Sequence, residues 1–333
     1  MRIIEEYISG PMFSSHIFDE YFGGMNIVVA DIETTGLSPK SASVILGGAV
    51  FAENGARKAI QFFGDTIDDE KELLERYTAL LERADVIVTY NGQRFDIPFL
   101  LNRMKRHGLD TSGMERLYSL DIYRVLRYHS HLPEILPNMK QKTVEIFLGD
   151  SDSRTDEIDG AQSVELYYEY VNSSGAKRGQ LLDSILLHNR DDIVRLSDMM
   201  RILRTLDVHE IMYSSGFPLA AGENIIHTEK IKMLKGRMSV QGQVMGDTAD
   251  YTCFSDGFAL SVSGKDGKLK LDIDCENIDD YTVADLRILG MDDEGLQKLG
   301  GYESGYLILR EGKEARCHEI NMLVKTLLQK CLS

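Results

Sequence analysis

The stretch IVVADIETTGL, residues 27–37, decides the predicted fold. Its first residues are apolar and mostly β-branched, so we predict a buried strand over residues 25–31. Asp31 and Glu33 stand two residues apart at the end of this strand, and alternation therefore places both side chains on one face. Buried carboxylates need a cation, basic partners or water. The spacing thus indicates a metal site, and a solvated strand end with harmless acids remains the alternative.

The residues that follow predict a sheet with helices packed on it. A hairpin of two strands is predicted first, and helices then alternate with strands, which is typical of a mixed α/β sheet. The predicted strands cover residues 43–52, 57–64, 85–90 and 117–122, and the predicted helices cover residues 68–84 and 98–107.

A third carboxylate stands in NGQRFDIPFL, residues 91–100. Asn91 and Gly92 end a strand, and Pro98 suits the first turn of a helix. Asp96 therefore lies near a helix N-terminus, where exposed amides favour its charged form and leave it available to a metal. Simple capping of the helix is the alternative.

A fourth carboxylate lies on a long helix, QLLDSILLHNRDDIVRLSDMMRIL, residues 180–203. His188 and Asp192 replace apolar residues on its core-facing stripe and lie one turn apart. Asp191 falls off this stripe, so we expect it to be solvated. A hydrogen-bonded His–Asp pair in the core is the alternative to a functional pair.

These segments together resemble a known superfamily. They resemble the three exonuclease motifs of the DEDD superfamily of RNase H-like 3′-to-5′ exonucleases. The resembling segments are residues 31–37, residues 91–96, and His188 with Asp192. Further features resemble its bacterial YprB-like branch: Asp121 after a strand, KTVEIFLG at residues 142–149, Arg154 with Asp159 and Gly160, and HNRDD at residues 188–192. The resemblance covers residues 25–206 and implies an RNase H-like mixed sheet flanked by helices.

One position departs from the superfamily pattern. Only Asn189, Arg190 and Asp191 separate His188 from Asp192, so a histidine stands at the spacing that tyrosine normally occupies. The resemblance associates this substitution with the YprB-like branch. It leaves the identity of the general base open.

The carboxylates and the resemblance point to the same chemistry. Asp31, Glu33, Asp96 and Asp192 would hold two divalent cations, and oxygen ligands favour Mg²⁺ or Mn²⁺ over zinc. The expected function is a metal-dependent 3′-to-5′ exonuclease that acts on single-stranded DNA or RNA ends and releases nucleoside 5′-monophosphates. His188 is the candidate that orients or deprotonates the attacking water. The candidate substrate-binding residues are Thr34, Leu37, Asn91 and Arg94.

The chain divides into three predicted regions: an N-terminal extension at residues 1–24, the exonuclease domain at 25–206, and a smaller α+β or β-rich accessory domain of unknown role at 207–333. The last region has strand-like stretches and a closing helix. We place these strands at residues 238–244, 258–262, 269–273 and 306–309, and the helix at residues 320–332.

Composition limits how this chain can meet nucleic acid. Its 37 Lys and Arg residues against 53 Asp and Glu residues give a net charge of −16, which excludes a broad basic binding face. We expect no signal peptide and no membrane span. The four cysteines lack C-x-x-C spacing, so we predict reduced thiols in a cytoplasmic protein. A non-catalytic nucleic-acid-binding module and a small-nucleotide phosphodiesterase remain alternative functions.

Overall fold

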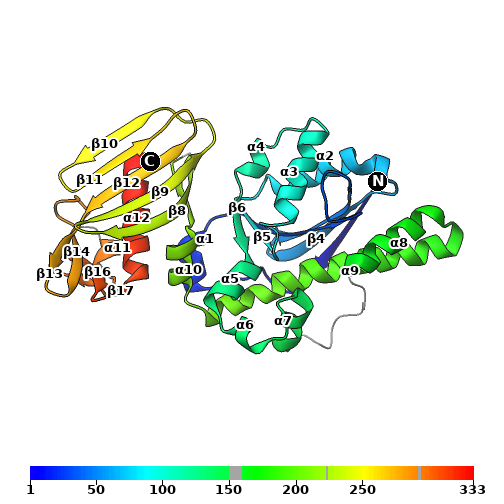
Figure 1. The fold of residues 1–333 in the computed structure, drawn as a ribbon, viewed down its shortest axis with the longest axis horizontal. Coiled ribbons are helices and arrows are strands. Elements are labelled where there is room, and N and C mark those ends of the chain that lie inside the picture. Colours follow the sequence, from blue (N-terminus) through cyan, green and yellow to red (C-terminus); the bar gives the residue numbers. More distant parts are fainter. Residues whose placement is uncertain (150–159, 223, 292–293) are drawn as a thin grey trace. The chain divides into compact units, whose positions relative to one another are not determined.

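The chain forms two compact units. The computed structural model describes residues 1–149, 160–222, 224–291 and 294–333 (Figure 1). The first unit comprises Met1–Ser15 and Gly24–Leu206, and the second comprises His16–Gly23 and Asp207–Ser333. Of the YprB-like features, Arg154 and Asp159 lie outside the described residues.

A six-stranded mixed sheet forms the centre of the first unit, with the strand order β1-β4-β3-β2-β5-β6. Neighbours from β1 to β2 pair antiparallel, whereas β2, β5 and β6 run parallel. This arrangement confirms the predicted mixed sheet. The strands are β1 (Arg2–Ile8), β2 (Ile27–Thr34), β3 (Val44–Glu53), β4 (Ala56–Phe63), β5 (Val86–Thr89) and β6 (Tyr118–Asp121).

Local sequence explains the centre of this sheet. Strand β2 extends past Asp31 because Glu33 and Thr34 still pair with β3. The β3–β4 hairpin turns at Asn54 and Gly55, whose φ angles of 52° and 79° lie in the left-handed region. Asn-Gly tolerates this conformation and gives the tight turn that matches strand twist.

Helices cover both faces of the sheet. Leucines of α2 and apolar residues of α3 pack into one core cluster with Val28, Ala30 and Ile32 of β2. On the other face, α8 and α9 supply Tyr167 and Ile185 to a second cluster. The helices of this unit are α2 (Glu70–Leu81), α3 (Asp96–Arg106), α4 (Ser112–Glu115), α5 (Ile122–His129), α6 (Leu132–Ile135), α7 (Gln141–Phe147), α8 (Gly160–Asn172) and α9 (Gly175–Met199), with 3-10 turns η1 (Ile67–Asp69) and η3 (Met200–Thr205).

Alternation along β2 fixes where its acids lie. Since Ala30 and Ile32 join the core beneath α2 and α3, Asp31 and Glu33 lie on the opposite side, which α9 covers. The long helix crosses below the sheet in Figure 1. The fold thus directs both carboxylates toward the helix that carries His188 and Asp192.

The first residues of the chain do not form a separate extension. Strand β1 adds to the edge of the sheet by pairing with β4 from Arg2 opposite Phe63 to Ile8 opposite Arg57. The following helix α1 (His16–Phe22) belongs to the second unit, where Phe18, Tyr21 and Phe22 are buried. The first 24 residues are therefore divided between the two units: β1 belongs to the first unit and α1 to the second.

The second unit is rich in antiparallel strands. One sheet has the order β10-β11-β12-β9-β8-β7, and another has β13-β14-β16-β15 with β17 beside β16. The strands are β7 (Pro218–Ala221), β8 (Asn224–Leu234), β9 (Arg237–Met245), β10 (Tyr251–Ser255), β11 (Phe258–Val262), β12 (Lys268–Asp274), β13 (Glu276–Ile278), β14 (Tyr281–Asp285), β15 (Tyr302–Glu303), β16 (Tyr306–Glu311) and β17 (Glu314–Ala315). This unit confirms the predicted β-rich C-terminal region.

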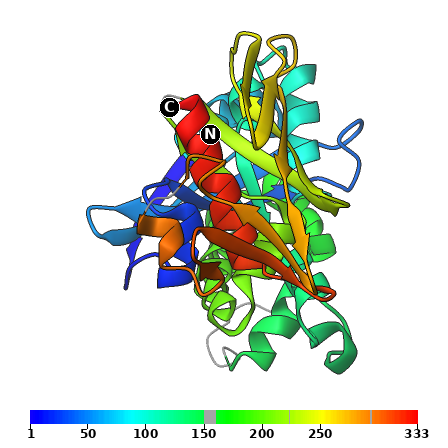
Figure 2. The same ribbon diagram turned by 90° about the vertical axis from the view of Figure 1, so that its left-hand side faces the viewer.

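The closing helix organises the core of the second unit. Helix α12 (Cys317–Leu332) packs against α10 (Val208–Ser215), β7 and β16, and crosses the strands in Figure 2. Helix α11 (Glu294–Gln297) also contacts it. All four cysteines are free thiols. Across the described parts of the chain, none of the helices combines the length and apolar character that crossing a membrane requires.

Candidate active site

Four carboxylates from three separate segments converge beside α9. Asp31 and Glu33 come from the end of β2, Asp96 begins α3, and Asp192 lies on α9. Glu33 and Asp96 are buried, whereas Asp31 and Asp192 are partly exposed. The structure therefore brings together all four acids proposed as metal ligands.

The backbone joins Asp96 to the first pair of acids. Its Oδ1 accepts a hydrogen bond of 3.2 Å from the amide of Ile32, the residue between Asp31 and Glu33. Burial raises the pKa of Asp96 to about 7, with smaller contributions from the charges of Asp121 and Glu33, while the Ile32 amide opposes the shift.

The charges of all three other carboxylates affect the pKa of Asp31. Its burial, followed by the charges of Asp96, Asp192 and Glu33, raises its pKa well above the ordinary value. A hydrogen bond from Asn189 partly offsets this effect. The acids thus destabilise one another's charged forms, and cations between them would relieve that repulsion.

His188 lies between two of the acids. Its Nε2 is 3.4 Å from Glu33 Oε1 and 3.7 Å from Asp192 Oδ2. One donor atom from each of Glu33, His188 and Asp192 lies within 4.8 Å of the other two, close enough to share a metal ion. The buried imidazole can therefore ligate an ion or orient a water beside one.

The prediction for Asp191 is wrong, because this residue is buried at 3% exposure. Arg190 donates a hydrogen bond of 3.1 Å to it and also pairs with Glu6 of β1. The ion pair between Arg190 and Glu6 links this part of α9 to the edge strand, a contact that the helical stripe alone could not predict.

The predicted substrate-binding residues occupy two loops. Thr34 is buried and donates a hydrogen bond of 2.8 Å to the Gly36 carbonyl, whereas Leu37 is 86% exposed. Asn91 adopts φ 65° in the turn after β5, and Arg94 is exposed just before α3. Thr34 thus supports its loop, and Leu37 and Arg94 present free surface.

Asp121 fixes the second of these loops. Its carboxylate accepts hydrogen bonds from the amides of Asn91 at 2.8 Å and Gln93 at 3.2 Å, and it also caps α5 through the Arg124 amide. Asp121 is buried at the end of β6. It is therefore a positioning residue for the loop that leads into Asp96.

Two polar residues at the site were not predicted from the sequence. Asn189, which is fully buried, donates a hydrogen bond of 3.0 Å to Asp31 Oδ2 and accepts one of 2.9 Å from Gln61. Ser163 of α8 is also buried and donates one of 3.0 Å to Glu33 Oε2. Asn189 carries one sequence signal, since it directly follows His188 on the same helix.

A polar pocket of about 610 Å³ adjoins the second motif. Its wall includes Asn91, Tyr123, Arg127 and Lys140. Gln141, at its other side, donates a hydrogen bond of 2.9 Å to the backbone oxygen of Asp192. The pocket therefore lies between the loop that leads to Asp96 and Gln141 of α7, which contacts the backbone of Asp192.

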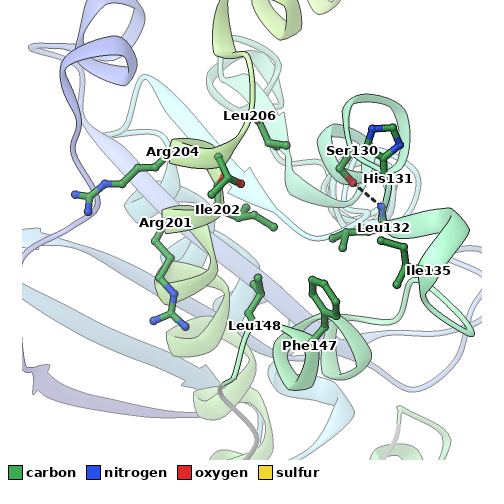
Figure 3. Close-up of a pocket in the computed structure, with 11 residues that line it drawn as sticks. Ser130, His131, Leu132, Ile135, Phe147, Leu148, Arg201, Ile202, Arg204 and Leu206 are labelled. Atoms are coloured by element: carbon green, nitrogen blue, oxygen red, sulfur yellow. Dashed lines mark hydrogen bonds between the residues drawn. The ribbon is translucent and has the colours of Figure 1, made fainter.

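A second, more apolar pocket of about 510 Å³ lies between α6, α7 and η3. Figure 3 shows Leu132, Phe147 and Leu148 directed toward a shared space, whereas Arg201 and Arg204 extend away from it. Its wall belongs to other residues than the four carboxylates. We assign it no part in the chemistry of the site.

The donor set fits divalent cations. It consists of carboxylate oxygens with one imidazole, and oxygen-rich sets of this kind suit Mg²⁺ and Mn²⁺. Burial, and then neighbouring negative charge, raises the pKa of Asp31 and of Asp96, and bound cations would stabilise both carboxylates in their charged form.

Comparisons with known proteins find related segments in polymerases. A DNA polymerase of Methanocaldococcus jannaschii is 37% identical over 70 residues, 21% of this chain and 4% of the polymerase. The PolC-type DNA polymerase III of Ureaplasma parvum is 29% identical over 139 residues, 35% of this chain and 10% of the polymerase. The chain thus spans a tenth or less of the length of these relatives.

Two solved structures align with parts of this chain. The family B DNA polymerase of Pyrobaculum calidifontis gives a TM-score of 0.41 at 21% identity, covering 54% of this chain and 24% of the polymerase. Exonuclease I gives 0.32 at 13% identity, covering 65% of this chain and 55% of the exonuclease. A family model matches residues 28–204, more than half of the chain. This match confirms the predicted RNase H-like fold, and the chain belongs to the RNase_H superfamily.

Proposed function

We propose that the first unit is a metal-dependent 3′-to-5′ exonuclease. It would hydrolyse phosphodiester bonds at the ends of single-stranded DNA or RNA and release nucleoside 5′-monophosphates. The convergence of Asp31, Glu33, Asp96 and Asp192 carries this proposal, because these acids come from three segments and three of them raise the pKa of the fourth. Such a cluster is unfavourable in a module that only binds phosphates.

The four carboxylates would hold two divalent cations, Mg²⁺ or Mn²⁺. Bound there, the cations would supply an activated water and stabilise negative charge on the departing 3′ oxygen. The carboxylates of Glu33 and Asp96 are buried, so the protein pre-sets their positions rather than ordering them on binding.

His188 is assigned to the attacking water. Its Nε2 is 3.4 Å from Glu33 and 3.7 Å from Asp192, so a water beside these acids lies within reach of the imidazole. A histidine can accept a proton near neutral pH. Asn189 and Ser163 hold Asp31 and Glu33 in place and act as positioning residues.

The polar pocket beside Asn91 is the proposed path of the nucleic-acid strand. Exposed Arg127 and Lys140 can meet backbone phosphates, and Tyr123 can stack on a base. Leu37 would lie near the terminal nucleotide, as the motif resemblance implies, and exposed Arg94 can supply positive charge beside the second motif. Contacts with only a few nucleotides are compatible with the net charge of −16, because they need only local positive charge.

The relatives support nucleic acid as the class of substrate. Two of the similar proteins are DNA polymerases, and the 139 residues shared with the PolC-type enzyme amount to 35% of this chain. The small share of those polymerases that is covered leaves the choice between DNA and RNA to experiment.

Digestion of a 5′-labelled single strand tests the proposal. We expect the full chain with Mg²⁺ or Mn²⁺ to shorten the strand stepwise from its 3′ end, and Asp31→Asn or Asp96→Asn to abolish this activity. Asp183→Asn is the matched control, because Asp183 is an exposed acid on α9 and should be dispensable. Equal activity of the wild type and both site variants would contradict the proposal.

A series of substrate lengths separates the alternatives. Mononucleotides from long strands support the exonuclease. Cleavage of dinucleotides alone would replace it with a small-nucleotide phosphodiesterase, and binding without cleavage would replace it with a non-catalytic module.

A further inference from the structure

Three helices of the second unit bring one carboxylate and two imidazoles together. Glu20 lies on α1, His209 on α10 and His318 on α12. His318 Nε2 is 2.9 Å from Glu20 Oε2, and the rings of His209 and His318 stack with centroids 3.9 Å apart. A donor atom from each of the three residues lies within 4.8 Å of the other two.

Buried polar side chains hold the ring of His209. The hydroxyl of Tyr21 lies 2.7 Å from His209 Nδ1. Asn321 Nδ2 donates hydrogen bonds of 2.9 Å to that hydroxyl and to the His209 backbone oxygen. Tyr21 and Asn321 are buried, so these contacts fix the orientation of the His209 ring. Because Nδ1 contacts the Tyr21 hydroxyl, Nε2 is the ring nitrogen available to a metal ion.

The surroundings of His209 favour its neutral form. Burial, and then the neighbouring His318, lower the pKa of His209. Two imidazolium ions at this separation would repel each other, whereas neutral imidazoles are the form that ligates a metal.

We propose that Glu20, His209 and His318 bind one zinc ion. Two imidazole nitrogens and one carboxylate oxygen are a familiar set of three zinc ligands, with a fourth position open to water. With zinc bound at Nε2, His209 Nδ1 would carry the proton and donate a hydrogen bond to the Tyr21 hydroxyl. Metal-bound histidines commonly donate such a hydrogen bond through their second ring nitrogen. Nitrogen ligands distinguish this site from the oxygen-rich carboxylate site of the first unit.

His16 can complete the site. It lies one turn before Glu20 on α1, with its Nδ1 3.4 Å from Glu20 Oε1, and its side chain is 89% exposed. This exposed imidazole can take the fourth position or leave it to water.

A zinc ion at this site would link helix α1 to the rest of the second unit. Residues 16–23 reach this unit without a strand of their own, and α1 packs on α10 and β7. Because the ligands come from α1, α10 and α12, an ion that binds only the folded form stabilises the packing of these three helices. We therefore expect the ion to contribute to the stability of the second unit.

Zinc titration of the full chain tests the proposal. The chelator-treated protein is kept in excess Mg²⁺, so that the carboxylate site is occupied, and Zn²⁺ is measured by competition with a chromophoric chelator. We expect one Zn²⁺ per chain and a higher melting temperature with Zn²⁺. Glu20→Gln and His318→Ala should each weaken binding by about tenfold or more and remove the thermal effect.

Two controls separate this site from other zinc ligands. His131→Ala should bind zinc as the wild type does, because His131 forms an exposed pair with Glu134, 3.7 Å apart, outside the cluster. Asp31→Asn should also bind normally, which keeps the zinc site independent of nuclease activity. Co²⁺ in place of Zn²⁺ should give visible d–d bands without a thiolate charge-transfer band.

The proposal is overturned by unchanged zinc affinity in Glu20→Gln and His318→Ala, by the absence of zinc binding to the wild type, or by a thiolate band that assigns the ion to cysteines. Glu20→Gln keeps the size of the side chain, so it carries the test even where His318→Ala lowers the yield of folded protein.

Discussion

Asn189 on α9 donates a hydrogen bond of 3.0 Å to the carboxylate of Asp31 on β2. The other end of the same amide accepts a hydrogen bond of 2.9 Å from Gln61 Nε2, which also donates to the Leu186 carbonyl. Gln61 thereby fixes which end of the Asn189 side chain faces Asp31. The helix that supplies His188 and Asp192 therefore also holds the acid at the centre of the proposed site.

Asn189→Ala should weaken metal binding. It removes the donor to Asp31 while Gln61 keeps its bond to Leu186, so the carboxylate loses its orientation but the fold is kept. We expect the Mg²⁺ concentration for half-maximal nuclease activity to rise by about tenfold to a hundredfold. Asn172→Ala is the control, because Asn172 is exposed at the end of α8.

A glycine offers a second way to move the same amide. A Cβ on Gly48 would lie 2.1 Å from Asn189 Oδ1, so Gly48→Ala must displace Asn189. It should reproduce the higher Mg²⁺ requirement, whereas Gly179→Ala, with nothing within 4 Å of its Cβ, should not. Normal Mg²⁺ dependence in both Asn189→Ala and Gly48→Ala would show that Asn189 does not position Asp31.

His188→Ala separates a base from a ligand. If His188 acts on the attacking water, the variant should lose about 100-fold or more in kcat with little change in Mg²⁺ affinity. Rates measured across a Mg²⁺ titration give both quantities. A parallel loss of Mg²⁺ affinity would instead make His188 a metal ligand, as its place within 4.8 Å of Glu33 and Asp192 permits.

Arg127→Ala tests the proposed strand path. Exposed Arg127 lines the polar pocket and lies over the ring of Tyr123, 6.0 Å from its centroid. We expect KM for a single strand to rise several-fold with kcat nearly unchanged, and the salt dependence of binding to fall by about one unit of slope. Arg116→Ala, an exposed arginine outside the pocket wall, should leave both values as they are.

His227 should make the second unit sensitive to acid. Burial lowers the pKa of this β8 residue to about 4 from an ordinary value of 6.5. The unfolded chain therefore binds a proton below pH 6.5 that the folded form takes up only near pH 4. The stability from neutral His227 is present above pH 6.5 and lost as pH falls toward 4, by up to about 3 kcal/mol.

Thermal melts of wild type and His227→Gln at several pH values measure this effect. Other acid-sensitive groups are common to both proteins, so their difference in melting temperature isolates His227. The difference should shift in favour of the variant between pH 7 and pH 4. A constant difference over this range would show that His227 does not titrate with folding.

Local patterns predicted the strands and helices that form the site. The apolar run before Asp31, the Asn-Gly hairpin and the stripe through His188 each carry a period or turn signal within a few residues. Strand β2 and helix α3 accordingly lie where those patterns indicate, with ends shifted by a few residues.

Contacts between distant residues could not be predicted in this way. Ser163 meets Glu33 across 130 residues, and Asn189 meets Asp31 across 158. Such pairs depend on how α8 and α9 pack on the sheet rather than on any local period. The same holds for β1, which pairs with β4 and is therefore an edge strand rather than part of a separate extension.

The positions of bound metal ions in a crystal show whether the four carboxylates form a two-metal site. Crystals of the full chain soaked in Mn²⁺, with data collected at the manganese absorption edge, reveal each ion by its anomalous signal. We expect two ions about 3.5–4 Å apart, held by Asp31, Glu33, Asp96 and Asp192. Manganese-saturated crystals with no ion among these four carboxylates would contradict this expectation.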